Sequence, residues 1–194
     1  MRISVITSTW RRHAVLLKRC IPSVLGQTLR PIEHIVISDG PDHELATLAA
    51  PIQGIVKLYF LPEHSEQEHW GVIPRREGVR LATGEWLAFL DDDNAWRPQH
   101  LSLLADAVCS TDADFAYSRA QRWRSGVPVD IVGEEPPEAG RIDTSLLLAR
   151  RQLFAVENWE VAGYAADWDI VRRWLDLGAS YAFVPEITLD YFLR

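Results

Sequence analysis

The feature that most constrains the fold of this chain is an apolar run that ends abruptly in three aspartates. Residues 86–90, W-L-A-F-L, show no polar alternation, which is typical of a strand buried on both faces in the middle of a parallel sheet. Asp91, Asp92 and Asp93 follow directly. Adjacent carboxylates repel one another by roughly 1 kcal/mol or more per close pair even in wet surroundings, so a positive charge must compensate for them.

The three aspartates fall where open α/β sheets collect their ligands, at the carboxyl end of a strand. Hard oxygen ligands suit a divalent cation, and phosphate oxygens of a substrate would complete its shell. The sequence therefore predicts a cation and phosphate site here. The alternative is an acidic turn before a helix, with Asn94 as its cap and Pro98 in its first turn.

Strands and helices alternate four times in the first half of the chain, which predicts a doubly wound, mostly parallel α/β sheet flanked by helices. Pro22 lies inside the first helical pattern and is expected to kink or restart it. The third helix should carry Arg75 and be closed by Gly84. The predicted strands are residues 3–6, 35–38, 56–61 and 86–90, and the first two helices end near residues 26 and 50.

The second half of the chain is less regular. A stretch rich in glycine and proline, residues 126–140, predicts a loop. A helix is expected from about residue 166 to residue 177. Short strands are expected at residues 115–118, 121–124, 142–149, 181–184 and 187–192.

Composition excludes several classes of protein. With 47% hydrophobic and 24% charged residues, this 194-residue chain is typical of a globular protein and not of a disordered one. Its net charge of -7 argues against a nucleic-acid partner. No segment approaches the roughly 20 apolar residues that span a bilayer. Because the N-terminus enters a strand at once, we expect no signal peptide and a cytoplasmic protein.

The two acids of the D-W-D sequence in the last predicted helix are expected to do different things. Asp167 precedes Ile170 and Val171 by three and four residues, so it shares their inward face. Asp169 precedes Arg172 and Arg173 by three and four residues instead, an ordinary solvated ion-pair arrangement. Asp167 is therefore a candidate site residue, and the alternative is that it only caps the helix.

Five segments taken together resemble the family 2 glycosyltransferases of the GT-A fold. They occur in the order of that family and extend from the start of the chain to about residue 169. The resemblance implies a Rossmann-like GT-A domain over residues 1–194, with a nucleotide-sugar-binding half in 1–95 and a short acceptor-side region in 96–194. The segments are I-S-V-I-T-S-T-W-R-R, S-V-L-G-Q-T, H-I-V-I-S-D-G-P-D, P-R-R-E-G-V-R-L-A-T-G-E-W-L-A-F-L-D-D-D-N-A-W and A-D-W-D.

The resemblance implies a donor site at the ends of the first strands. Thr7, Ser8 and Trp10 match positions where relatives place hydroxyl and aromatic side chains against the nucleotide. Asp39 matches the acid that hydrogen-bonds the base. Arg75 matches an arginine that an asparagine usually follows; here the next residue is another arginine, which makes the site more basic.

The resemblance also implies the roles of the acids. Asp91 and Asp93 match the D-x-D that holds Mn²⁺ or Mg²⁺ and reaches the ribose, and Asp92 lies between them on the donor side. Asp167 matches the usual catalytic base, although Ala166 replaces the acid that normally precedes it.

The chain departs from the family pattern near its end. Many relatives carry a metal-binding histidine there, after a tyrosine-containing strand, whereas this chain reads Tyr191-Phe192-Leu193-Arg194. Either Arg194 faces the diphosphate or that contact is absent. By fold analogy, the acceptor walls are expected at residues 62–70 and 126–140, with Trp123 and Trp159 nearby.

The activity implied is metal-dependent, inverting transfer of a hexose from a nucleoside diphosphate sugar to a hydroxyl group. The donor would be of the UDP, GDP or dTDP type, and the acceptor a glycan, a lipid-linked molecule or a small molecule. We expect a protein without a transmembrane segment, either free in the cytoplasm or peripheral to the inner face of a membrane; a homodimer is left open.

Two other classes of protein are compatible with some of these features. A non-catalytic sugar- or nucleotide-binding module is the alternative if Asp167 only caps its helix. A sugar nucleotidyltransferase would also use a parallel sheet and acidic metal ligands, but it usually needs a glycine-rich loop after the first strand. This chain has Thr7-Ser8-Thr9-Trp10 there. The histidines and acids of residues 62–70 have no regular ligand spacing, which favours a solvated surface over a second metal site.

Overall fold

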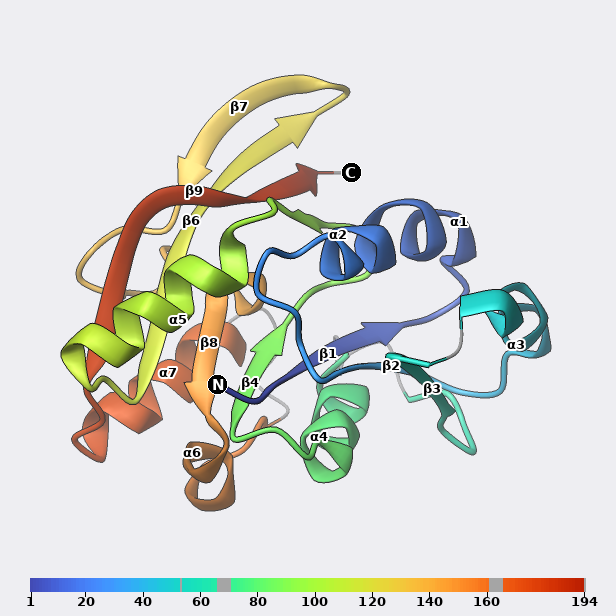
Figure 1. Ribbon diagram of the computed structural model, residues 1–194, viewed down its shortest axis with the longest axis horizontal. Coiled ribbons are helices and arrows are strands. Elements are labelled where there is room, and N and C mark those ends of the chain that lie inside the picture. The colour runs from blue at the N-terminus through green and yellow to red at the C-terminus, as the bar shows by residue number, and fades with distance from the viewer. Residues whose placement is uncertain (53, 66–70, 161–165, 194) are drawn as a thin grey trace.

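The structure is a computed structural model that describes residues 1–52, 54–65, 71–160 and 166–193. Within these ranges, nine strands form one mixed sheet, with helices packed on both faces (Figure 1). The strands are β1 (Ile3–Thr9), β2 (Glu33–Ser38), β3 (Val56–Phe60), β4 (Trp86–Phe89), β5 (Ala95–Trp96), β6 (Phe115–Arg124), β7 (Val127–Val132), β8 (Leu147–Arg150) and β9 (Tyr181–Leu193).

The helices follow the predicted alternation in the first half. The first one confirms the restart at Pro22, because a π-helical turn precedes a new α-helix that has this proline in its first turn. The helical elements are α1 (His13–Val15), η1 (Leu16–Cys20), α2 (Ile21–Leu25), α3 (His43–Leu48), η2 (Ala50–Ile52), α4 (Val72–Leu81), α5 (His100–Thr111), η4 (Thr144–Leu146), α6 (Arg151–Val156) and α7 (Ala166–Asp176).

The N-terminal half of the sheet is parallel, as predicted. Its strands lie in the order β3-β2-β1-β4, and every neighbouring pair among them is parallel. Parallel strands end at the same edge of a sheet, so the residues that follow β1, β2 and β4 come together there. β4 then pairs antiparallel with β8, and the other half of the sheet has mixed pairing.

Side chains of β1 alternate between the two faces of the sheet, and each face meets a different helix. Thr7 points toward η1, where its hydroxyl lies 3.6 Å from the sulfur of Cys20. Ile6 points to the other face, against α4. A Cβ on Gly78 would lie 2.4 Å from the Cγ2 of Ile6, so this glycine lets α4 lie directly on β1. The helix ends at Leu81, not at Gly84.

Four predictions about the second half were wrong. The strand expected at residues 142–149 is limited to β8, because residues 144–146 form the 3₁₀ turn η4 before it. Residues 115–124 form the single strand β6, and residues 181–193 form the single strand β9 beside it. Register shifts between these two strands accommodate Pro185, which had divided the sequence pattern of β9 into two runs. Residues 127–132 are not a loop, because β7 pairs antiparallel with β6.

An aromatic cluster in the core supports the sheet from the side of α7. The rings of Phe89, Phe154, Trp159, Trp174 and Phe115 contact one another in a chain, with centroids 4.9–5.6 Å apart. Trp159 is thus buried in the core and does not line the cleft described below. Among the described helices, none is both long and apolar enough to cross a membrane.

Candidate functional site

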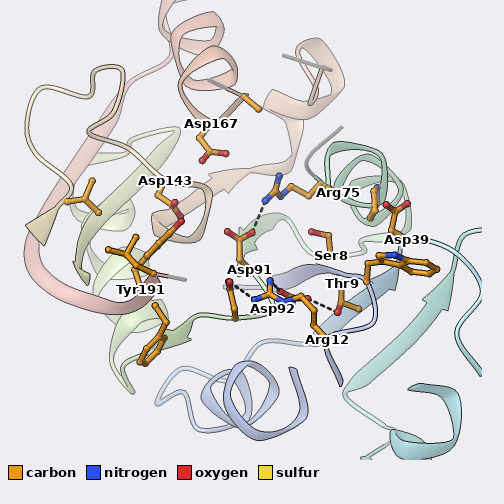
Figure 2. A pocket seen from close by; sticks show the side chains of 18 of the residues that line it. Ser8, Thr9, Arg12, Asp39, Arg75, Asp91, Asp92, Asp143, Asp167 and Tyr191 are labelled. Atoms are coloured by element: carbon orange, nitrogen blue, oxygen red, sulfur yellow. Dashed lines mark hydrogen bonds and ion pairs between the residues drawn. The ribbon is translucent and has the colours of Figure 1, made fainter. Parts of the chain in front are cut away.

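A cleft of about 810 Å³ lies at the carboxyl edge of the parallel strands (Figure 2). One wall comes from the ends of β1, β2 and β4 and from the start of α4. The other comes from β6, β7, β9, the segment before η4 and the start of α7. Its lining residues are Ser8, Thr9, Trp10, Arg12, Asp39, Gly71, Pro74, Arg75, Asp91, Asp92, Asp93, Arg122, Val132, Gly140, Ile142, Asp143, Ala166, Asp167, Tyr191, Phe192 and Leu193.

Two arginines supply the positive charge that the three aspartates require. Arg12 donates to Asp92 and to Asp93, each at 2.6 Å, and thus bridges the two carboxylates. Arg75 donates from α4 to Asp91 at 2.7 Å. Sequence reasoning singled out Arg75 but missed Arg12. The signal available was its place directly after the first strand, at the edge where the aspartates lie.

The middle aspartate is the most enclosed of the three. Burial raises the pKa of Asp92 to about 6, against the opposing effects of Arg12 and of a hydrogen bond from Thr9. The Thr9 hydroxyl donates to this carboxylate at 2.7 Å. Asp92 is therefore tied to β1 and to Arg12.

The turn formed by Asp91, Asp92 and Asp93 does not begin a helix. Asn94 accepts a hydrogen bond from the backbone N–H of Phe192 at 3.0 Å, and α5 begins only at His100 with Gln99 before it. The side chain of Asn94 therefore ties the turn to β9 instead of capping a helix. This geometry excludes the interpretation of the three aspartates as an ordinary acidic helix start.

The end of β2 forms a second part of the cleft. Asp39 accepts hydrogen bonds from the backbone N–H of Ser65 at 3.0 Å and from its hydroxyl at 2.6 Å. The ring of His64 stacks on Trp10, with centroids 4.2 Å apart and planes inclined by 11°. Trp10 and Asp39 thus lie together at one end of the cleft, an aromatic face beside a carboxylate.

Ser8 and Thr7, neighbours on β1, point to opposite faces of the sheet, and only Ser8 reaches the cleft. Ser8 faces the cleft beside Gly71, where a Cβ on the glycine would lie 2.8 Å from the Ser8 hydroxyl. Thr7 does not reach the cleft, which corrects the prediction of a donor contact. Its buried hydroxyl lies 2.9 Å from the Nε2 of His34, because alternation along the strand turns it to the face opposite Ser8.

The acceptor-side wall brings a further carboxylate to the cleft. Asp167 faces the cleft from α7, as its position relative to Ile170 predicted. Asp143, which sequence reasoning missed, lines the same space, and Figure 2 shows Arg75 between Asp91 and Asp167. No local pattern marks Asp143, since it lies in an irregular segment and enters the cleft only through tertiary packing.

Both acceptor-side acids hold their protons more strongly than usual. Burial raises the pKa of Asp143 well above its ordinary value, and the charges of Asp167 and Asp91 add to this. Burial also raises the pKa of Asp167, although Arg75 and hydrogen bonds from Thr144 oppose the shift. Raised carboxyl pKa values within a cleft are characteristic of functional sites, although ion-pair networks produce them too.

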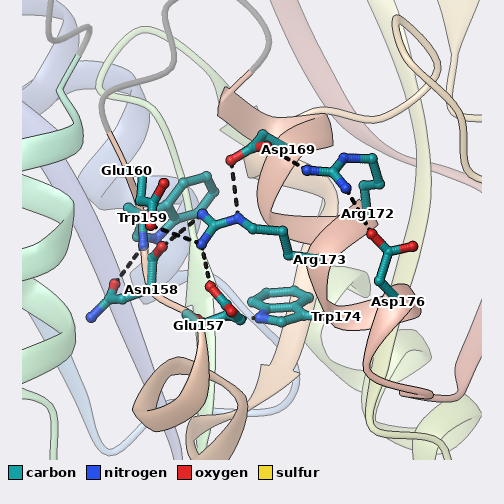
Figure 3. A network of polar contacts seen from close by, with 9 residues as sticks. All are labelled: Glu157, Asn158, Trp159, Glu160, Asp169, Arg172, Arg173, Trp174 and Asp176. Atoms are coloured by element: carbon teal, nitrogen blue, oxygen red, sulfur yellow. Dashed lines mark hydrogen bonds and ion pairs between the residues drawn. The ribbon is translucent and has the colours of Figure 1, made fainter.

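Asp169 has the separate place that the sequence predicted for it. Figure 3 shows Arg173 among acceptors from two segments, the helix α7 and residues 157–160. Asp169 lies 3.1 Å from Arg172 and 3.1 Å from Arg173. Arg173 also donates to Glu157 and, at 2.9 Å, to the backbone carbonyl of Asn158. This network fixes α7 from the side away from the cleft.

The donor chemistry of the cleft suits a divalent cation that is shared with a substrate. Among the described residues, no three His, Cys, Asp or Glu side chains are grouped to hold a metal ion. Asp91 and Asp93 nevertheless line the cleft together, and Mg²⁺ typically takes one or two carboxylates plus substrate phosphates. These residues therefore fit an ion whose other ligands are phosphate oxygens and water.

The remaining predictions divide into three groups. Arg194 and residues 66–70 lie outside the described residues, whereas residues 62–65 of the expected acceptor wall do not line the cleft, and His64 and Ser65 contact Asp39 instead. Val132 and Gly140 from the 126–140 stretch line the cleft. Trp123 does not; its ring N–H donates instead to Asp190 at 3.0 Å.

Comparisons with known proteins agree with this geometry. The sequence model described as glycosyl transferase family 2 matches residues 4–173. An uncharacterized glycosyltransferase of Mycoplasma pneumoniae is 33% identical over 129 residues, which cover 64% of this chain and 42% of that protein. The uncharacterized glycosyltransferase YwdF of Bacillus subtilis is 27% identical over 196 residues, which cover 99% of this chain and 62% of that protein.

Solved structures show the same fold. TarS of S. aureus in complex with UDP-GlcNAc superposes with a TM-score of 0.80 at 15% identity, covering 100% of this chain and 59% of the other. The fold is therefore GT-A, as expected. The chain spans between 34% and 62% of the length of three of its curated relatives. Because the family match covers most of the sequence, the chain belongs to glycosyl transferase family 2.

Proposed function

We propose that this chain is an inverting glycosyltransferase that moves a hexose from a nucleoside diphosphate sugar to an acceptor hydroxyl with the help of Mn²⁺ or Mg²⁺. One observation carries the proposal. Asp39, Asp91, Asp93 and Asp167, which come from three separate segments, line a single cleft at the carboxyl edge of the sheet. The family match and the glycosyltransferase relatives support the same reaction class.

The end of the cleft at Trp10 and Asp39 suits a nucleobase. An aromatic face can stack on a base, and a carboxylate can accept a hydrogen bond from a ring N–H. A pyrimidine such as uracil offers both features. The complex of TarS with UDP-GlcNAc supports a UDP sugar as the first donor to test.

The middle of the cleft suits a diphosphate. Arg12 and Arg75 bring two guanidinium groups to the three aspartates, and guanidinium groups bind phosphate oxygens through charge-assisted hydrogen bonds. Asp93 and Asp91 are the residues that would hold the cation. When bound there, the cation supplies Lewis-acid stabilisation of the departing diphosphate.

Asp167 is the proposed general base. It would take the proton of the acceptor hydroxyl while the acceptor oxygen bonds to the anomeric carbon of the donor. The bond from that carbon to the phosphate oxygen breaks, and its electron pair leaves with the diphosphate. A raised pKa makes this carboxylate a stronger base, and the nearby Arg75 favours its ionised form. A single displacement inverts the anomeric centre and needs no nucleophilic side chain.

The test is release of nucleoside diphosphate from a panel of UDP, GDP and dTDP sugars with Mn²⁺, in the wild type and in Asp167→Asn. We expect the variant to lower turnover by roughly 10²-fold or more, with UDP affinity nearly unchanged. Asp169→Asn is the matched control. It changes the same residue type two positions away, on the ion-pair side of α7, and should keep turnover.

The outcomes separate the alternatives. If no donor is turned over although UDP binds, the chain is a binding module. If a donor is turned over equally by the wild type and by Asp167→Asn, this aspartate is not the base. Formation of a nucleotide sugar from a nucleoside triphosphate and a sugar phosphate would instead establish a nucleotidyltransferase.

A further inference from the structure

The 3₁₀ turn η4 connects the two sides of the cleft. Thr144 and Ser145 are fully buried in it. The Thr144 hydroxyl donates to the carboxylate of Asp167. The next hydroxyl, of Ser145, accepts a hydrogen bond from the backbone N–H of Asp91 at 3.1 Å. Of two consecutive side chains of this turn, the first therefore contacts the proposed base and the second contacts the backbone of Asp91 on the donor side.

The turn itself is held firmly. Asp143 accepts a hydrogen bond from the backbone N–H of Ser145 at 2.8 Å and so caps the turn. The backbone carbonyl of Ser145 accepts from the ring N–H of Trp96 at 2.8 Å. Because the turn is buried and both backbone groups of its middle residue, Ser145, are hydrogen-bonded, it can act as a rigid spacer between Asp91 and Asp167.

Charge alone does not fix the direction of the Asp167 carboxylate. Arg75 on α4 attracts it, whereas Asp91 repels it from the donor side. Asp143, which precedes η4, repels it from the acceptor side. Attraction and repulsion between charges depend mainly on distance and only weakly on the direction of approach. The Thr144 hydroxyl is a directional contact, since a hydrogen bond weakens steeply when its geometry departs from linear.

We propose that Thr144 is a positioning residue whose hydroxyl orients the Asp167 carboxylate toward the acceptor hydroxyl. In this proposal, η4 holds the carboxylate at a fixed distance from Asp91–Asp93 on the donor side. This inference rests on the proposed function, because it takes Asp167 as the base. A general base must lie within hydrogen-bond reach of the proton that it removes. A misplacement of about 1 Å can cost a hundredfold in rate.

The test compares Thr144→Val with Thr144→Ser, using the donor that the panel above identifies, or UDP-GlcNAc if several are turned over. Valine keeps the shape of threonine and removes the hydroxyl, whereas serine keeps the hydroxyl. We expect Thr144→Val to lower kcat about tenfold and to leave the KM for the donor unchanged. The loss is partial because the backbone amide of Thr144 also contacts the carboxylate. Thr144→Ser should restore most of kcat.

Two further variants make the result specific. In an Asp167→Asn background, Thr144→Val should cause no additional loss, because the hydroxyl acts only through that carboxylate. Thr188→Val is a control for lost stability. Its buried hydroxyl lies 2.6 Å from His100 and 2.6 Å from Ser118, away from the cleft lining. It should lower the melting temperature while leaving kcat unchanged.

The outcomes distinguish this inference from the function on which it rests. If Asp167→Asn is inactive while Thr144→Val turns over like the wild type, the positioning role is wrong and the proposed function stands. The positioning role is also wrong if Thr144→Ser loses as much kcat as Thr144→Val, or if the loss persists in the Asp167→Asn background. If Asp167→Asn is fully active, the base assignment fails and this inference fails with it.

Discussion

At the scale of single residues, the carboxylates of the cleft differ in how far nearby positive charge compensates for them. Asp91, Asp92 and Asp93 each form an ion pair with an arginine. Asp143 instead caps η4 and faces other acids, whose effect Arg75 offsets in part. An enclosed carboxylate among like charges favours its protonated form, so its ionisation at neutral pH costs folding free energy.

Asp143→Asn should therefore stabilise the protein at neutral pH. The pKa of Asp143 is raised in the folded state, so the folded protein binds this proton more tightly than the unfolded chain does. The stability that Asp143 contributes is complete below about pH 3.9, the ordinary pKa of an aspartate. It is lost as the pH rises from there through the raised pKa of the folded state. Asparagine removes that charge and keeps an oxygen that can accept from Ser145.

Thermal unfolding between pH 3 and pH 8 measures this effect. We expect the melting temperature of Asp143→Asn to exceed that of the wild type at pH 7 and to approach it at the acid end. Asp143→Ala, which also removes the cap, should be less stable than Asp143→Asn. A lower melting temperature for Asp143→Asn at pH 7 would show that its charge is compensated.

At the scale of elements, a buried glutamate joins the parallel strands at the edge opposite the cleft. Glu33 at the start of β2 accepts from the Ser4 hydroxyl of β1 at 2.6 Å and from Lys57 of β3 at 2.6 Å. Thr83, between α4 and β4, donates to it from its backbone N–H at 2.7 Å and from its hydroxyl at 2.8 Å. One side chain thus holds β1, β2, β3 and the approach to β4 in register.

Glu33→Gln should destabilise the protein at neutral pH. Burial alone would raise the pKa of Glu33, but hydrogen bonds from Lys57, Ser4 and Thr83 lower this pKa to about 2. The folded state therefore gains stability above the ordinary glutamate pKa of about 4.3 and loses it as pH falls toward 2. We expect Glu33→Gln to lower the free energy of unfolding at pH 7 by about 2–3 kcal/mol.

Urea unfolding at pH 7 and pH 3 measures this difference, which should be clearly smaller at the lower pH. Glu77→Gln is the matched control. Glu77 pairs with Arg80 on the outer surface of α4, and its loss should change stability little. Equal loss in both variants at pH 7 would mean that the Glu33 network adds no more than a surface ion pair.

At the scale of the whole molecule, the cleft forms where the parallel half of the sheet meets the mixed half. Trp10, Asp39 and Asp91 stand on the parallel half, whereas Tyr191 and Asp167 come from the other. A ligand that fills the cleft contacts both halves and binds only the folded protein. Ligand binding therefore raises the free energy of unfolding of the molecule as a whole.

A thermal-shift experiment with UDP and Mn²⁺ tests the proposed cation site at this scale. At a hundredfold excess over its Kd, a ligand adds about 2.7 kcal/mol of stability, which corresponds to about 5–10 °C for a chain of this size. We expect this shift for the wild type with UDP and Mn²⁺ together, and a much smaller one with UDP alone. Asp93→Ala should lose the Mn²⁺-dependent part.

The control is Asp106→Ala, which removes an exposed aspartate of α5 and should keep the full shift. A shift by UDP that is the same with and without Mn²⁺ would show that the cation is not needed for nucleotide binding. In that case Arg12 and Arg75 would be left as the counter-charges for the diphosphate.

The sequence by itself determined the parallel half of the sheet and much of its ligand edge. The buried strand β4 is a continuous apolar run and β2 has an apolar centre at residues 35–37, so the acids that follow these strands, Asp39 and Asp91–Asp93, are predicted to lie at one edge. Helical periodicity likewise placed Asp167 on the inward face of α7. These features depend on neighbouring residues, so a local pattern is sufficient to predict them.

Only the tertiary structure decided which side chains meet across the cleft. The pairing of β6 with β9 brings together segments about 70 residues apart, and neither strand shows a clean local pattern. Arg12 reaches Asp92 across 80 residues, and Thr144 reaches Asp167 across 23. Such contacts depend on strand order and on the face to which each side chain points, as Thr7 shows, and the sequence around each partner does not contain that information.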